Sequence, residues 1–349
     1  SSDVCSSDLS TELRYVSHTT ETTDENVKTI SVLLADPVYK TEVTLYFKIY
    51  AKEDVVEQWS VIRNNEKGTL TMGKYASANL TFTAKNYYLT HFHGEWAQEM
   101  KPEQTLLTHG IKTIDSKLGT RANLYEHPVF VLAFDQPASE TEGKVMLGTL
   151  AWSGNFKLDF EVDAYHQLRV IPGINPFQSD YPLASGKEFK TPSFIYTFSD
   201  KGTGEASRQL HRWARDYRLC DGNGTRLTLL NNWEATNFNF DQDKIVKLFA
   251  DGKKLGVDLF LLDDGWFANK YPRNDDKAGL GDWEPNAKKL HDGVSYLVKE
   301  AGKAGVKFGI WVEPEMVNPK SELYEKHPDW VIRQTERPEH YFRNQLVLD

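Results

Sequence analysis

The 349-residue sequence contains only two cysteines, Cys5 and Cys220, and neither belongs to a C-x-x-C or Cys/His cluster. This excludes a disulfide framework and argues against a structural zinc site. No apolar run approaches the roughly 18 residues that a membrane-spanning helix needs. Basic residues are also in deficit, 41 against 50 acidic residues, which gives a net charge of -9. An acidic surface argues against nucleic acid and against an anionic membrane as partners.

Aromatic side chains are abundant instead. The chain has 9 Trp, 16 Tyr and 18 Phe, and six of the tryptophans follow residue 200. Apolar residues make up 40% and charged residues 26% of the chain, an ordinary balance for a globular protein that buries a core. The length allows two or three domains.

Both ends of the sequence are unusual. Residues 1–10 have no apolar period, repeat the triplet Ser-Ser-Asp and lack the basic and apolar regions of a signal peptide, so we interpret them as a non-native leader. The other end stops inside the apolar run QLVLD, from which we expect a fragment of a longer protein. The compartment stays open, with the cytoplasm slightly favoured.

Within residues 11–203, the sequence from about residue 27 to residue 200 follows a period of two. Val43, Leu45, Phe47 and Ile49 alternate with Thr44, Tyr46, Lys48 and Tyr50, and the run FKLDFEV repeats the pattern. Turn signals such as Asn64-Asn65, Glu142-Gly143 and Ser153-Gly154 separate these runs. Many short strands at this spacing predict an antiparallel β-sandwich.

From residue 204 the pattern changes. Residues 204–224 begin with a predicted helix that links the two halves, and residues 225–349 alternate nearly continuous apolar strands with amphipathic helices. Gly256 and Gly305 fall where helix C-caps favour glycine. Buried strands that alternate with helices are typical of a parallel sheet. The three strand–helix units are fewer than half of a (β/α)₈ barrel.

In such barrels the active site lies where strands end and loops begin. The polar and aromatic clusters of the second half fall at these positions: Asn231-Asn232-Trp233-Glu234, Asp263-Asp264-Gly265-Trp266 and Trp311-Val312-Glu313-Pro314-Glu315. Three successive strand ends that combine carboxylates with tryptophan favour a binding site over core packing.

Asp263 and Asp264 have two interpretations. The plainer one is an Asp-Gly turn after a strand. The sharper one is a pair of acceptors for ligand hydroxyls, because a sugar presents many O–H donors and no charge. Adjacent strand residues face opposite sides, so both carboxylates point into a barrel only if the strand ends between them.

The tryptophans fit the same kind of ligand. An indole offers a flat apolar face to the C–H side of a pyranose, while its N–H donates to an oxygen. Their strand-end positions favour Trp233 and Trp311 as site residues. Trp213 on the linking helix and Trp330 are expected in the core.

Other interpretations stay open from the residues alone. Glu313 could act with a strand-end Asp as acid and base of a glycosidase, or could cap a helix or hold Arg343. Strand-end carboxylates could bind Mg²⁺ as in enolase-type barrels, although no Lys or His base stands at a strand end. The motif HFHGE has metal-ligand residue types without a convincing third ligand, so no metal site is expected there.

Five motifs follow one another in the second half: LLNNWEATNFNFD, LFLLDDGWF, GLGDW, FGIWVEPEMVNPKSELYEKHPDWVI and RNQLVLD. With them the chain resembles the family 36 glycoside hydrolases, the microbial α-galactosidases. The resemblance is dense over residues 225–349 and looser over the β region, where it depends mainly on LTHFHGEWAQEM. It implies a β-supersandwich over residues 11–203, incomplete at its amino end, a linking helix over 204–224, and a truncated (β/α)₈ TIM barrel over 225–349.

The resemblance also implies retaining hydrolysis through a covalent galactosyl intermediate. The family's nucleophile is an Asp in a Lys-Trp-Asp pattern at the end of the fourth barrel strand, and its acid/base is an Asp further on. Neither pattern occurs in this sequence. We therefore expect both residues beyond residue 349, no catalytic residue within the chain, and an inactive fragment.

Carried over position by position, the resemblance assigns substrate binding to Trp233, Asp263, Asp264, Trp311 and Arg343. The two Asp would accept the O4 and O6 hydroxyls of galactose, and Trp311 would form a wall of the pocket. Arg343 would bond a ring hydroxyl or orient a carboxylate.

The expected function is therefore an α-galactosidase that acts on melibiose- or raffinose-type oligosaccharides. The alternatives are a related α-galactosyl transglycosylase, an α-N-acetylgalactosaminidase, or a non-catalytic carbohydrate-binding protein. No cofactor and no metal are implied. The resemblance further implies that the full-length protein forms a homo-oligomer.

Overall fold

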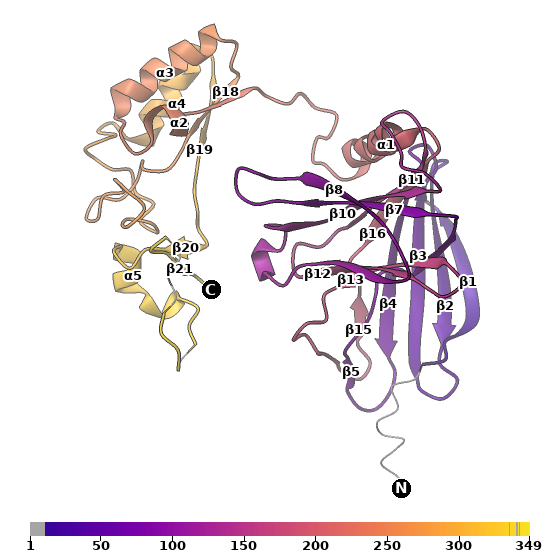
Figure 1. Cartoon of the computed structure of the whole chain (residues 1–349). Helices are drawn as coiled ribbons and strands as arrows, with labels where there is room; N and C mark the ends of the chain where they lie inside the picture. Colours follow the sequence, from indigo (N-terminus) through magenta and orange to yellow (C-terminus); the bar gives the residue numbers. More distant parts are fainter. Residues whose placement is uncertain (1–10, 335, 340, 342) are drawn as a thin grey trace. The chain divides into compact units, whose positions relative to one another are not determined.

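The computed structural model describes residues 11–334, 336–339, 341 and 343–349 (Figure 1). Residues 1–10, interpreted above as a leader, lie outside the described residues. The chain divides into two compact units, one that ends at Asn223 and one that begins at Gly224. β-Sheet dominates, with a few helices.

The first unit is built from antiparallel strands. Its larger sheet has the order β1-β2-β3-β4-β16-β11-β10-β7-β8, and β15 also pairs with β4. These strands are β1 (Arg14–Thr22), β2 (Val27–Ala35), β3 (Thr41–Tyr50), β4 (Val55–Asn64), β7 (Tyr87–His93), β8 (Lys101–Leu106), β10 (Glu126–Phe134), β11 (Lys144–Leu150), β15 (Glu188–Lys190) and β16 (Phe194–Ser199).

A second sheet of the first unit has the order β6-β13-β12-β9, and β14 pairs with β5. The bounds are β5 (Leu70–Met72), β6 (Leu80–Thr83), β9 (Gly110–Asp115), β12 (Phe156–Val162), β13 (Gln167–Ile174) and β14 (Tyr181–Leu183), with a 3₁₀ turn η2 (Gly119–Arg121). Phe130 of the larger sheet meets Phe160 of the second sheet edge-on, with 4.8 Å between ring centroids. Both belong to one buried apolar cluster, so the two sheets share a core.

Alternation explains this core. Phe156, Leu158, Phe160 and Val162, predicted on one face of a strand, are all buried. Helix α1 (Gly202–Tyr217) follows β16. Trp213 of α1 is 6% exposed and packs with the apolar residues at the ends of β2, β3 and β4, which confirms its expected place in a core.

The second unit holds a parallel sheet with the order β17-β18-β19, its strands being β17 (Leu229–Asn231), β18 (Leu259–Leu262) and β19 (Lys307–Ile310). Helices α3 (Gln242–Lys254) and α4 (Gly293–Ala304) pack against each other (Figure 1). Phe249 of α3, Phe260 of β18 and Leu297 of α4 share one core. The remaining elements are α2 (Trp233–Thr236), β20 (Met316–Val317), α5 (Glu322–Lys326), η3 (Pro328–Trp330) and β21 (Leu346–Val347).

Local signals placed most of these elements. Gly256 and Gly305 follow α3 and α4 with φ of 83° and 79°, the left-handed region that glycine favours, as predicted. Trp330 was predicted wrongly, because it is 47% exposed and stacks on His327 with 4.1 Å between ring centroids. Among the described residues, no helix is long and apolar enough to cross a bilayer.

Candidate functional site

The candidate site lies where β17, β18 and β19 end. These strands run parallel, so their carboxyl ends meet at one edge of the sheet. Leu262 pairs with Ile310 at the last position of β18 and β19. The next residues, Asp263 and Trp311, therefore leave the sheet side by side, and the Trp311 N–H donates to the Leu262 carbonyl at 2.8 Å.

Asparagines at the end of β17 fix Asp263. The Asn231 side-chain amide donates to Asp263 Oδ2, and the Asp263 N–H donates to Asn232 Oδ1 at 2.8 Å. The Asp264 N–H donates to Asp263 Oδ1 at 2.7 Å. The Asp263 carboxylate is half-buried and keeps acceptor sites that these bonds do not use.

Asp264 is held by a residue that the sequence did not reveal. Arg273 donates from Nε to Asp264 Oδ1 at 2.9 Å and from Nη2 to Oδ2 at 2.8 Å. The Arg273 side chain is 0% and the Asp264 side chain 8% exposed, so this bidentate ion pair is buried. Gly265 follows with φ of 100°, so a turn after the strand is present together with the carboxylate pair.

A half-buried lysine, Lys289, lies near Asp264 and binds the loop that carries this ion pair. Lys289 Nζ donates to the carbonyls of Phe238, Gly265 and Arg273 at 2.9, 2.8 and 3.1 Å. Burial lowers the pKa of Lys289 to about 8, although the Asp264 carboxylate opposes this shift. Because all three donors meet backbone carbonyls, Lys289 joins three segments of the unit behind the candidate site.

The predicted tryptophans differ in their surroundings. Trp311 is half-buried and meets Trp283 of the GLGDW loop edge-on, with 6.2 Å between ring centroids. Trp266 is buried and donates from Nε1 to the Trp311 carbonyl at 2.9 Å. These three indoles line the ends of β18 and β19, and Trp311 keeps an exposed portion that a sugar face could contact.

Trp233 does not end the first strand as predicted; it begins α2. Asn231 Oδ1 accepts the Trp233 N–H at 2.7 Å, and this side-chain-to-backbone bond turns the chain away from the sheet. The indole is half-buried and meets Phe238 edge-on at 5.0 Å. Asn231 contacts both Trp233 and Asp263, so the tryptophan is still tied to the strand-end carboxylates.

Arg343 lies in a strained turn. Arg343 and Asn344 have φ of 53° and 57°, a left-handed conformation that residues other than glycine rarely adopt. The Arg343 side chain is 53% exposed, and its Nε lies 3.8 Å from Asp276 Oδ2. No hydrogen bond joins it directly to Asp263 or Asp264 among the described residues.

Glu313 is half-buried, and the charged side chains of the candidate site act on it. Burial raises the pKa of Glu313 above its ordinary value, and the carboxylates of Glu315 and Asp264 raise it further. The guanidinium groups of Arg273 and Arg343 oppose the shift. Asp264, Arg273 and Arg343 therefore all lie close enough to act on one carboxylate.

The raised pKa of Glu313 predicts a pH-dependent stability. The folded state holds the proton more tightly than the unfolded state, so the stability falls as the pH rises from the unfolded pKa of Glu313 through its folded pKa, and the loss is complete above that. We expect Glu313→Gln to melt at a higher temperature than the wild type at about pH 8. At about pH 4 the two proteins should melt at nearly the same temperature. Thermal melts over this range measure the difference. The exposed Glu284→Gln serves as control, and an equal effect at both pH values would contradict the prediction.

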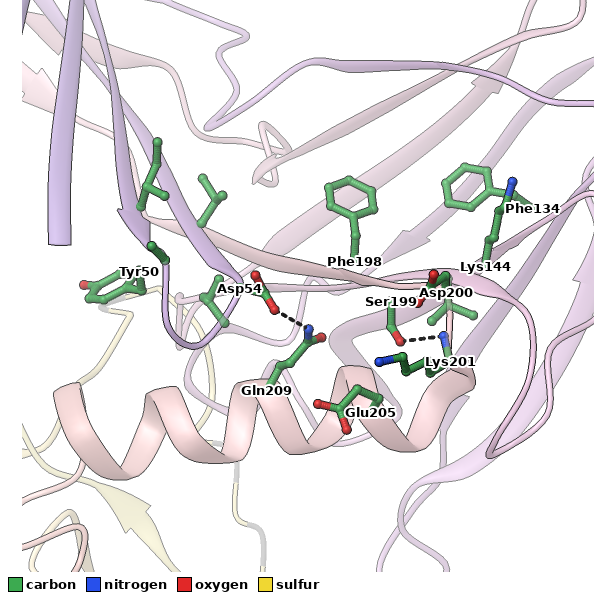
Figure 2. A pocket seen from close by; sticks show the side chains of 15 residues that line it. Tyr50, Asp54, Phe134, Lys144, Phe198, Ser199, Asp200, Lys201, Glu205 and Gln209 are labelled. Atoms are coloured by element: carbon green, nitrogen blue, oxygen red, sulfur yellow. Dashed lines mark hydrogen bonds between the residues drawn. The ribbon is translucent and has the colours of Figure 1, made fainter. Parts of the chain in front are cut away.

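Chemistry-bearing groups also occur elsewhere among the described residues. Within the described residues, no group of three or more His, Cys, Asp or Glu side chains could hold a metal ion. A cavity of about 710 Å³ opens in the first unit beside α1 (Figure 2). Two of its carboxylates have partners of their own, because Glu205 pairs with Arg208 and Arg212 and Asp54 accepts from Gln209.

The structure thus brings Asp263, Asp264 and Trp311 together and links Trp233 and Arg343 to them through intermediates. Arg273 and Lys289 were missed, as was Asn318, whose Oδ1 accepts from Arg273 Nη1 at 2.9 Å. Each belongs to a polar loop or follows a strand end without any periodic pattern, so no sequence signal short of the fold itself could have found them.

Comparisons with known proteins identify the class to which this arrangement belongs. The model of the glycosyl hydrolase family 36 N-terminal domain matches residues 5–184, and the Melibiase model matches residues 188–349. The chain belongs to glycosyl hydrolase family 36, as the motifs predicted.

Individual relatives agree with this family assignment. The alpha-galactosidase AgaA of Geobacillus stearothermophilus is 37% identical over 338 residues, which cover 96% of this chain and 45% of that protein. The bifunctional alpha-galactosidase/sucrose kinase AgaSK of Mediterraneibacter gnavus is 36% identical, with 93% and 34% covered. The chain therefore spans half or less of the length of these relatives.

Solved structures give the same result. The crystal structure of AgaA superposes with a TM-score of 0.90 at 35% identity and covers 97% of this chain and 49% of that one. Variants of AgaA were solved in complex with stachyose and with raffinose, with TM-scores of 0.90 and 0.89.

Proposed function

We propose that the whole protein is an α-galactosidase that hydrolyses terminal α-galactosides of the melibiose and raffinose type. The observation that carries the proposal is the placement of Asp263 and Asp264 beside Trp311 at one sheet edge, in a chain of family 36. The activity printed for the relatives and the stachyose and raffinose complexes of AgaA support this substrate class.

The proposed site recognises sugar by its hydroxyls. Asp263 and Asp264 accept hydrogen bonds from the O4 and O6 hydroxyls of galactose, and the exposed part of Trp311 packs on the sugar ring. Trp233 borders the same pocket, and Arg343 bonds a ring hydroxyl or orients a carboxylate. These assignments join the five residues into one galactose subsite.

The proposed chemistry is retaining double displacement. One carboxylate attacks the anomeric carbon, and a second, about 5–5.5 Å away in retaining enzymes, protonates the leaving oxygen and then activates water. No Lys-Trp-Asp pattern occurs among the 349 residues. In this proposal both catalytic Asp belong to the part of the whole protein that lies outside the chain.

The proposal includes a finer architecture. Residues 11–203 form a β-supersandwich, residues 204–224 a linking helix, and residues 225–349 the first strand–helix units of a (β/α)₈ barrel. The whole protein forms a homo-oligomer. Two sheets that share a core and a parallel sheet with packed helices support the architecture, while the oligomer rests on the family resemblance alone.

Hydrolysis of p-nitrophenyl α-galactoside tests the proposal. We expect turnover by the whole protein and none by the 349-residue chain, because water attack gains little without a nucleophile and an acid/base across the bond. Release of free galactose from raffinose distinguishes hydrolysis from galactosyl transfer. Assay of p-nitrophenyl α-N-acetylgalactosaminide tests the alternative of an α-N-acetylgalactosaminidase. An inert whole protein would refute the activity. Turnover by the 349-residue chain that Glu313→Gln removes would make Glu313 catalytic.

A further inference from the structure

We propose that Arg273 and Asn318 are positioning residues that aim the Asp264 carboxylate at the sugar and fix it relative to the Arg343 turn. This inference rests on the proposed function. It assigns a role to two buried residues that touch no substrate in that proposal: Arg273 acts through Asp264, and Asn318 acts through Arg273 and through the chain beside Arg343.

Each guanidinium nitrogen of Arg273 donates a hydrogen bond. Its Nε and Nη2 hold the two oxygens of Asp264, and Nη1 donates to the Ala278 carbonyl at 3.2 Å and to Asn318 Oδ1 at 2.9 Å. The guanidinium also lies beside the rings of Phe238 and Phe267, 5.7 and 5.9 Å from their centroids. A planar group held on all sides leaves the carboxylate one orientation.

The bidentate pairing of Arg273 Nε and Nη2 with the two carboxylate oxygens, called the fork below, leaves Asp264 able to bind sugar. A carboxylate has about four acceptor sites, and Arg273 uses one on each oxygen. Each oxygen therefore keeps one site, and its direction is set by the plane of the guanidinium. The fork fixes where a sugar hydroxyl must lie to donate to Asp264, which is a constraint on the configuration of the sugar.

The burial of the Arg273–Asp264 pair indicates a role besides stabilising the fold. Replacement of a buried ion pair by apolar residues of similar size is often neutral or stabilising, because both charges lose their hydration. Arg273 is 1% exposed, in a unit whose other arginine ion pairs are partly exposed. Geometric control of Asp264 is a role that an apolar pair could not supply.

Asn318 extends the control to the Arg343 turn. Its side chain is buried, and Oδ1 accepts from Arg273 and from the Leu280 N–H at 2.9 Å. Its Nδ2 donates to the Asn344 carbonyl at 2.8 Å and to the Asp276 carbonyl at 3.2 Å. One amide thus joins the guanidinium that holds Asp264 to the left-handed turn that carries Arg343.

The test uses Arg273→Lys in the whole protein. Lysine keeps the charge but loses the fork, so Asp264 can rotate. We expect kcat/KM for p-nitrophenyl α-galactoside to fall about tenfold to a hundredfold, and kcat/KM for a deoxy analogue without the hydroxyl that Asp264 accepts to fall much less. Arg333→Lys, which alters an exposed pair with Glu339 in the same unit, is the matched control and should leave both substrates unchanged.

A double variant separates positioning from folding. In an Asp264→Asn background, Arg273→Lys should lower kcat/KM by less than about twofold, because the group through which Arg273 acts is already gone. Melting temperatures are recorded for every variant, and rates are measured well below them. Equal losses on both substrates, or the same loss with and without Asp264, would assign Arg273 a structural role and overturn the inference. A wild-type protein without α-galactosidase activity would instead refute the proposed function, and the inference with it.

Discussion

Asp264→Asn in the whole protein is expected to lower kcat/KM for an α-galactoside about tenfold to a hundredfold, because hydrogen bonds to a charged acceptor contribute roughly 1.5–3 kcal/mol. The amide keeps the shape of the side chain but replaces one acceptor oxygen with a donor. That oxygen meets both a sugar hydroxyl and the Arg273 guanidinium in the proposed site. Steady-state kinetics on the galactoside measure the effect.

The deoxy analogues supply the control for this prediction. A 4-deoxy or 6-deoxy galactoside lacks one of the hydroxyls that donate to the carboxylates, so for one of them the wild-type bond is already missing and Asp264→Asn should cost much less. The analogue that is spared also identifies which hydroxyl Asp264 accepts. If the galactoside and both analogues lose the same factor, Asp264 serves only to anchor Arg273 and the turn at Gly265.

Arg273→Met should lower the free energy of unfolding of the second unit by about 3–5 kcal/mol, because it leaves the Asp264 carboxylate buried without its counter-ion. The paired variant Asp264→Leu/Arg273→Met should recover most of this loss, since neither charge then remains in the interior. Urea unfolding followed by tryptophan fluorescence measures both variants.

Arg333→Met is the comparison for this stability prediction. Its pair with Glu339 is partly exposed, so the loss should be about 1 kcal/mol or less. Failure of the paired variant to recover would mean that Arg273 stabilises the unit mainly through its bonds to Ala278 and Asn318, and not by neutralising Asp264.

Local patterns predicted the parts of the site that depend on strand ends. Asp263, Asp264 and Trp311 follow apolar runs that become β18 and β19, and a parallel pairing brings their ends together. Trp233 shows the limit of this reasoning. The apolar run before it predicts a strand, but the strand ends at Asn231, whose side chain bonds the Trp233 N–H and starts a helix.

The prediction that Trp330 is buried fails for a related reason. An indole near a His-Pro pair was expected in the core because apolar area favours burial, yet it packs on His327 at the surface. Nothing in the surrounding sequence distinguishes it from Trp213, which is buried against β3. The difference arises from which sheet lies nearby, and that is a property of the fold.

The sequence by itself determined the alternating strands, the glycine caps at Gly256 and Gly305, the strand-end carboxylates and the family, because each of these depends on residues that are close together along the chain. The tertiary structure alone decided the pairing of Arg273 with Asp264, the bonds of Asn318 to the Arg343 turn, and the shifted pKa values of Glu313 and Lys289. These features depend on burial and on hydrogen bonds between segments far apart in sequence, and such contacts exist only after the chain has folded.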